Sequence, residues 1–185
     1  MAPARFPNGL ELRAGASVRS TGRRLEGYAA TFGTPAQIGA FRETIRAGAF
    51  RVSLARPGAD VLALVDHDPS RLLARTSSGT LRLAEDGKGL AFSLDVPNTQ
   101  LGRDVLALVE RGDVGGMSFG FRVAPGGDHW PDASTRELQA VELAEISVVH
   151  AWPAYSQTSV SARARAMGES QAAQRIRRMA ILGIV

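Results

Sequence analysis

The chain has 185 residues, a hydrophobic content of 44%, a formal net charge of +4 and no cysteine. This length provides one domain with a proper core and terminal arms. The lack of cysteine excludes disulfides and a thiol nucleophile, and with three histidines it makes a metal site unexpected. No apolar run reaches the roughly 18 residues of a membrane helix, and the first residues lack the pattern of a signal peptide. We therefore expect a cytoplasmic protein with no cofactor and no membrane partner.

The excess positive charge is confined to one end of the chain. Residues 163–185 contain five arginines and one glutamate, whereas the rest has 17 basic and 17 acidic residues. A nucleic-acid-binding barrel would spread basic and aromatic side chains over one sheet face. The neutral body and the aromatic content of 6% argue against that class. We expect no nucleic-acid partner, and we interpret residues 162–185 as a basic tail, helical or disordered.

The first half of the chain is predicted to be mostly strand. Residues 1–21 form an N-terminal arm or a first edge strand, and residues 25–32 and 61–65 form strands. The spacing of Phe41, Ile45, Ala49 and Leu54 indicates a short helix between them. Residues 79–83 and 90–96 follow as a hairpin turned at Asp86-Gly87.

In the second half, a helix opens after Asn98 or Thr99 and ends at Gly112. A strand then carries Ser118, residues 125–131 form a loop, and residues 136–149 form a last strand or strand pair. Many short strands with two helices are typical of a β-rich α+β fold. Over residues 22–161 we expect a small antiparallel β-barrel with flanking helices.

Ser118 is the first candidate for chemistry. It lies in a strand-like run in which Met117, Phe119 and Phe121 alternate with Ser118 and Gly120. The period of two sends the large residues to a core and leaves the serine on the opposite face with little bulk around it. We expect this geometry to hold a hydroxyl rigidly and leave it reachable.

A serine nucleophile needs a base, usually a histidine, and a third group that orients the base. His67 follows a strand, His129 lies in a Gly/Pro-rich loop, and His150 follows an apolar pair. By strand parity Glu145 faces away from the core, and His150 faces toward it unless a bulge at Val149 intervenes. From these residues alone, a structural serine remains the more common interpretation.

Several ordered motifs resemble one known family. They are residues 67–68 (HD), 76–83 (TSSGTLRL), 102–105 (GRDV), 111–121 (RGDVGGMSFGF) and the closing segment 143–155 (LAEISVVHAWPAY). Over about residues 22–161 the chain resembles the prohead serine proteases, the capsid-maturation enzymes of tailed phages and gene transfer agents. One departure is Ala74, where the family often has glycine.

The resemblance implies particular site residues. It places the nucleophile at Ser118 and the general base at His67, with the acidic residue of the closing motif, Glu145, as third member. The related herpesvirus assemblins use a second histidine instead, for which His150 is the alternative. We favour Glu145 because the family branch and the strand parity agree. Oxyanion contacts could come from backbone amides near Gly115, Gly116 or Gly120, or from Arg122.

The resemblance also implies a function. It indicates a serine endopeptidase that cleaves the scaffold, or the scaffolding segment of the major capsid protein, and also itself. This would occur inside the immature capsid in the host cytoplasm, with the protease as a homo-oligomer. The alternative is a catalytically inactive capsid-assembly module with the same assemblin-like fold. That module would be expected to have lost catalytic positions, whereas Ser118, His67 and Glu145 are all present.

Overall fold

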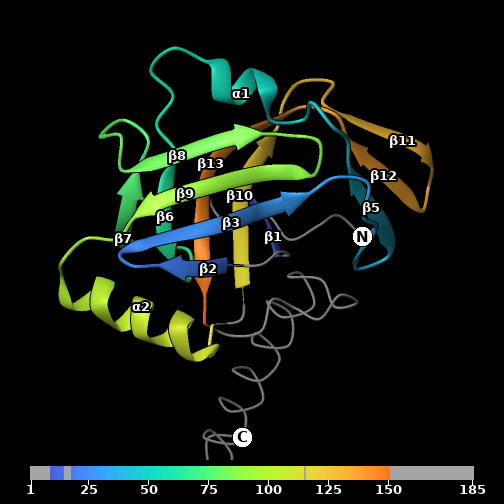
Figure 1. Ribbon diagram of the computed structural model, residues 1–185. Helices are drawn as coiled ribbons and strands as arrows, with labels where there is room; N and C mark the ends of the chain where they lie inside the picture. Colours follow the sequence, from blue (N-terminus) through green and yellow to red (C-terminus); the bar gives the residue numbers. More distant parts are fainter. Residues whose placement is uncertain (1–8, 15–17, 115, 151–185) are drawn as a thin grey trace, which may run out of the picture.

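The computed structural model describes residues 9–14, 18–114 and 116–150. The expected end of the domain at residues 151–161 and the basic tail at 162–185 lie outside this part. The described strands form three open sheets, with two helices at their margins (Figure 1). The elements are β1 Glu11–Ala14, β2 Val18–Thr21, β3 Arg24–Thr31, β4 Ala36–Ile38, β5 Phe41–Ile45, α1 Arg51–Ala55, β6 Leu62–Val65, β7 Asp68–Arg75, β8 Leu81–Glu85, β9 Gly89–Asp95, α2 Gln100–Arg111, β10 Gly116–Val123, β11 Asp128–Asp132, β12 Thr135–Leu138 and β13 Val141–Val149.

The five-stranded sheet, in the order β1-β10-β13-β6-β7, carries the candidate site. β10 pairs antiparallel with β1 on one side and with β13 on the other, and β13 pairs parallel with β6. Met117, Phe119 and Phe121 of β10 are at most 2% exposed and face the core. The Phe119 ring packs against those of Phe50 and Phe121, with centroids 5.6 and 5.2 Å apart. The predicted alternation of β10 is therefore confirmed on its core face.

The other two sheets have the orders β2-β3-β9-β8 and β11-β12-β5-β4. α1 contacts β13 and β8, and α2 contacts β2 and β7 (Figure 1). The predicted β-rich fold with a few helices is thus confirmed. However, the described strands are not closed into the expected antiparallel barrel, because the three sheets remain separate and the pairings β13–β6 and β12–β5 are parallel.

Local signals explain the elements that the sequence predicts well. The Thr99 side chain accepts a hydrogen bond from the Gly102 amide at 3.1 Å and so caps α2. Gly112 ends this helix with a φ of 77°, which glycine adopts without steric cost. In the β8–β9 hairpin, the Asp86 carboxylate accepts from the amides of Lys88 and Gly89 at 2.7 and 3.0 Å.

Two local predictions are wrong. Residues 41–45 form strand β5 rather than part of a helix, and α1 is confined to Arg51–Ala55. Residues 128–132, within or beside the expected loop, form β11. β5 pairs with the adjacent β4 and, in parallel, with the distant β12, whereas β11 forms a hairpin with β12, the next strand along the chain. The parallel pairing of β5 with β12 is a tertiary contact, which the spacing of apolar residues along residues 41–54 does not reveal.

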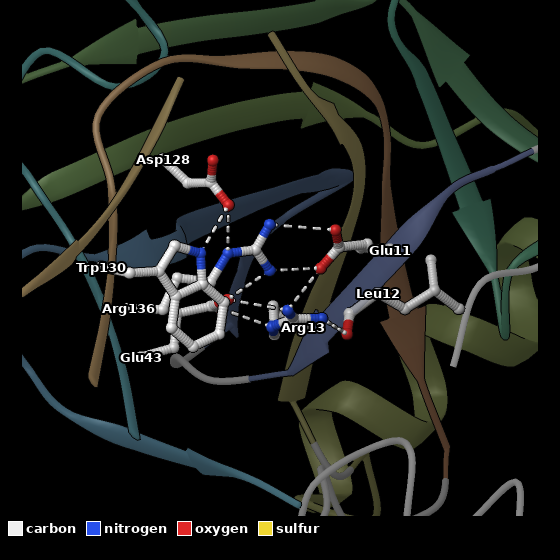
Figure 2. A network of polar contacts seen from close by, with 7 residues as sticks. All are labelled: Glu11, Leu12, Arg13, Glu43, Asp128, Trp130 and Arg136. Carbon is white, nitrogen blue, oxygen red and sulfur yellow. Dashed lines mark hydrogen bonds and ion pairs between the residues drawn. The ribbon is translucent and has the colours of Figure 1, made fainter. Parts of the chain in front are cut away.

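A buried network of charges joins β1 to β5 and β12 (Figure 2). The Arg13 guanidinium donates to both carboxylate oxygens of Glu43, at 2.5 and 2.8 Å, and to Glu11 at 2.7 Å. Arg136 donates to Glu11 at 2.8 Å, to Glu43 at 3.1 Å and to Asp128 at 2.9 Å. Burial would raise the pKa of Glu11, but Arg136 and Arg13 outweigh it and hold this pKa below its usual value.

We expect replacement of Glu43 by alanine to lower the free energy of unfolding by about 3–5 kcal/mol, because it leaves Arg13 and Arg136 buried with one carboxylate fewer. Glu137→Ala is the matched control on β12. The ion pair of Glu137 with Arg46 is long, at 3.4 Å, and the Arg46 side chain is 60% exposed, so its loss should cost about 0–1 kcal/mol. Chemical denaturation measures both variants, and equal losses would contradict a stabilising role for the network.

Candidate active site

Ser118 lies on β10, opposite Ala14 of β1 and Ser147 of β13. Its hydroxyl donates a hydrogen bond to the main-chain carbonyl of Arg13 at 2.9 Å. The residue is only 1% exposed, so the prediction of a reachable hydroxyl is wrong for this conformation. The reason is that β10 is an inner strand with a neighbour on each side, and β1 supplies an acceptor for the serine.

His67 lies in the tight turn between β6 and β7. Val65 pairs with Asp68, so only Asp66 and His67 form the loop. Their φ angles are 53° and 61°, and positive values at both central residues are the requirement of a type I′ hairpin turn. A non-glycine residue held in this region costs on the order of 1–3 kcal/mol and marks sites that the surrounding structure must stabilise.

Strand β13 holds the turn in place. The Asp66 amide donates to the carbonyl of Val148 at 2.9 Å, and the His67 amide donates to the hydroxyl of Ser147 at 3.1 Å. Both bonds fix the main chain from which the His67 ring projects. The position of the imidazole is therefore set by β13 as well as by its own hairpin.

Glu145 contacts the histidine ring. Its Oε1 lies 2.8 Å from Nδ1 of His67, and its Oε2 accepts a hydrogen bond from the Ser147 hydroxyl at 2.6 Å. The Glu145 side chain is 7% exposed and that of His67 is 21% exposed. A carboxylate can only accept, so Nδ1 carries the hydrogen in this bond and Nε2 is the ring nitrogen available as a base.

Two features of the sheet make room for this carboxylate. β13 pairs Glu145 with Gly120 but Leu143 with Phe121, so Ala144 is an extra residue in a β-bulge. The bulge lets Leu143 face the core on one side while Glu145 faces the opposite side. A Cβ atom on Gly120 would lie 2.3 Å from Oε1 of Glu145. The glycine opposite the carboxylate therefore leaves the space that the carboxylate fills.

The two candidates for the third member occupy different positions. Glu145 contacts His67, whereas His150 contacts Asp66 through its amide at 2.9 Å and through Nδ1 at 2.6 Å. Arg71 also donates to Asp66, at 2.8 Å. Partial burial would raise the pKa of Asp66, but these hydrogen bonds outweigh it and hold the pKa below its usual value. The His150–Asp66 pair thus braces the turn that carries His67.

The oxyanion candidates lie along β10. Gly116 and Gly120 are each two residues from Ser118 on the same strand, and Arg122 is exposed further along it. Gly115 lies outside the described residues. The oxyanion role of these residues stays a prediction.

No group of three or more His, Asp or Glu side chains in the described part of the chain is placed to hold a metal ion. The helices there lack the length and apolar character that a membrane crossing needs.

The family model described as caudovirus prohead serine protease matches residues 10–173. This chain belongs to that family. The match begins just before β1 and includes every described strand and helix. No curated protein and no solved structure matches the chain. The resemblance seen in the sequence motifs is confirmed, and the match extends it toward both ends of the chain.

Membership of the prohead serine proteases gives the coarse function. The family acts in the maturation of assembling phage capsids, so a serine protease activity and an association with capsid proteins follow for this chain. The geometry adds residues that sequence reasoning missed. Ser147 joins Glu145 to the main chain of His67, and Asp66 joins that turn to His150. Ser147 shares strand parity with Glu145, and this was the signal that could have identified it.

Gly120→Ala is expected to reduce proteolysis by this prohead protease about 100-fold. The new methyl group would lie 2.3 Å from Oε1 of Glu145, the mobile end of a side chain, so the carboxylate should shift away from His67. Cleavage rates and thermal unfolding would be measured together. Gly87→Ala is the control, because a Cβ there meets nothing within 4 Å. Full activity of Gly120→Ala would show that the position of Glu145 does not matter.

Proposed function

We propose that this chain is a serine endopeptidase in which Ser118 is the nucleophile, His67 the general base and Glu145 the residue that orients the base. The observation that supports the proposal most strongly is the 2.8 Å contact between Glu145 and Nδ1 of His67. It fixes the tautomer in which Nε2 can take a proton. The register supports it further, because Ser118 pairs with Ser147, whose hydroxyl binds the amide of His67.

In the proposed reaction, Oγ of Ser118 attacks the carbonyl carbon of a peptide bond while Nε2 of His67 takes the hydroxyl proton. Glu145 stabilises the imidazolium that forms. The tetrahedral intermediate then collapses, the C–N bond breaks, and His67 gives the proton to the leaving amine. Water, activated by the same imidazole, hydrolyses the acyl-enzyme ester and restores the serine.

The resting hydroxyl must change partner before it can react. In this structure it donates to the carbonyl of Arg13 and is buried. Attack requires rotation of Ser118 away from that carbonyl toward His67, together with access for a peptide. Catalytic hydrogen bonds are often absent from a resting enzyme and form in the complex with substrate. This resting arrangement fits an enzyme that must stay idle until the capsid has assembled.

The proposed substrates follow from the family. They are the scaffold or the scaffolding segment of the major capsid protein, and the protease itself. Homo-oligomer formation inside the particle would concentrate the enzyme beside these substrates. The site therefore acts on other chains of the same assembly, within the immature capsid.

The test is co-expression of this chain with the major capsid protein of the same particle, followed by intact-mass spectrometry of both proteins. We expect the capsid protein, the protease or both to be shortened, and the new termini would define the cleaved bonds. Particles that assemble while both proteins remain at full length would contradict the proposal.

One observation favours a second candidate, a capsid-assembly module without activity. The buried Ser118 is bonded to Arg13 rather than to His67, as expected if the hydroxyl serves only to hold β1 against β10. This candidate predicts that Ser118→Ala alters stability but never the length of any protein in the particle.

A further inference from the structure

We propose that Ser147 is a positioning residue of this site, which holds the carboxylate of Glu145 and the main chain of His67 at the same time. The inference rests on the proposed function, and it adds a fourth side chain to the three already assigned. Ser147 is 0% exposed and lies on β13, between its pairing partners Ser118 on β10 and Leu64 on β6. It therefore stands at the centre of the three strands that carry the site.

The Ser147 hydroxyl uses both its donor and its acceptor capacity within the site. It donates to Oε2 of Glu145 at 2.6 Å and accepts from the amide of His67 at 3.1 Å. A hydroxyl has one donor and can accept as well, so a single small side chain serves both partners. Alanine would remove both bonds at once, and valine would in addition place a methyl group against a carboxylate.

The first consequence concerns the direction of the Glu145 carboxylate. The 2.6 Å separation is typical of a charge-assisted bond to an ionised carboxylate. With Oε2 held by Ser147, Oε1 is directed at Nδ1 of His67, and Gly120 borders it closely. Rotation of the carboxylate would break one of these two bonds. Ser147 thus sets the plane in which the imidazole is held.

The second consequence concerns the backbone of the base. His67 has a φ of 61°, in the left-handed region that non-glycine residues rarely adopt. The hydrogen bond from its amide to Ser147 helps to hold this conformation. Loss of the hydroxyl would therefore remove one hydrogen bond that holds the His67 main chain. It would also leave Glu145, the partner of Nδ1, less constrained.

The experiment measures the tautomer and the proton exchange of the His67 ring directly and does not require catalytic turnover. Full-length chain carrying Ser118→Ala, which prevents self-cleavage, is labelled with ¹⁵N, and the histidine ring signals are recorded by NMR. His129→Gln and His150→Gln identify the other two histidines. We expect the parent to show His67 as the Nδ1–H tautomer with a slowly exchanging ring proton. Ser147→Ala should give a mixture of tautomers and faster exchange, and Ser147→Thr, which keeps the hydroxyl, should restore the parent spectrum.

Ser53→Ala is the matched control, because the Ser53 hydroxyl also binds β13, accepting from the Leu143 amide at 2.9 Å. It should leave the His67 signals unchanged. If Ser147→Ala does not fold, Ser147→Cys provides the same test with a weak donor of similar shape. An unchanged His67 tautomer and exchange rate in the folded Ser147 variants would overturn the proposal.

Activity measurements with Ser118 intact separate this inference from the proposed function. Ser147→Ala should lower kcat about 10- to 100-fold with little change in KM. If the parent cleaves no capsid protein while the His67 signals still depend on Ser147, the proposed function fails and the positioning role stands. If cleavage occurs but neither kcat nor the ring signals depend on Ser147, the positioning role fails alone.

Discussion

Ser118→Ala is expected to lower the cleavage rate by about 10⁶-fold, so that co-expressed capsid protein stays at full length. The reason is that removal of a triad nucleophile typically costs this much in turnover, leaving only the contributions of binding and oxyanion contacts. Intact-mass spectrometry of particles made with the wild type and with the variant would measure the effect. The new termini should be present in the first sample and missing from the second.

Two controls make this result interpretable. Ser93→Ala removes a serine hydroxyl from β9, in a different sheet, and should leave cleavage intact. Thermal unfolding of Ser118→Ala should reveal a loss of about 1 kcal/mol, because the bond to the Arg13 carbonyl is gone. Cleavage that persists in the variant would exclude Ser118 as the nucleophile and would point to another protease in the sample.

Glu145→Gln is expected to reduce kcat about 10⁴-fold, the second largest effect. The amide can present its NH₂ group to Nδ1 of His67, which favours the wrong tautomer and leaves the imidazolium without a counter-charge. In the wild type, Oε1 of Glu145 lies 2.8 Å from that nitrogen. Steady-state kinetics on a peptide that spans a mapped cleavage site would measure the change.

His150→Gln is the matched comparison, because His150 is the alternative third member. Its ring binds Asp66 rather than His67, so we expect less than a tenfold reduction in kcat together with a lower stability of the turn. A large loss with His150→Gln and a small one with Glu145→Gln would reverse the assignment and favour the histidine triad of the assemblins.

The lowered pKa of Asp66 determines the pH range in which its contacts with His150 and Arg71 stabilise the folded chain. A carboxyl whose pKa is lower in the folded chain than in the unfolded chain stabilises the fold at pH values above its pKa in the unfolded chain, about 3.9. That contribution is lost as the pH falls through the lower, folded value. The contacts of Asp66 with His150 and Arg71 therefore hold the His67 turn near neutral pH and release it only in strong acid.

The sequence by itself determined the elements whose signals are local. The alternation around Ser118 predicted its strand and core face, Thr99 and Gly112 predicted both ends of α2, and Asp86 predicted a hairpin. These features depend on side-chain period, capping and turn chemistry within a few residues, which is why one sequence suffices. The motif order also identified the family.

Only the tertiary structure decided how these pieces meet. The bulge at Ala144, which points Glu145 toward His67, depends on the pairing of β13 with β10. The burial of Ser118 and its bond to Arg13 depend on β1, and the partners lie 105 residues apart. The charged network that ties β1 to β5 and β12 spans up to 125 residues. Register and burial are properties of strands that meet in space, and the local pattern of a single strand does not contain them.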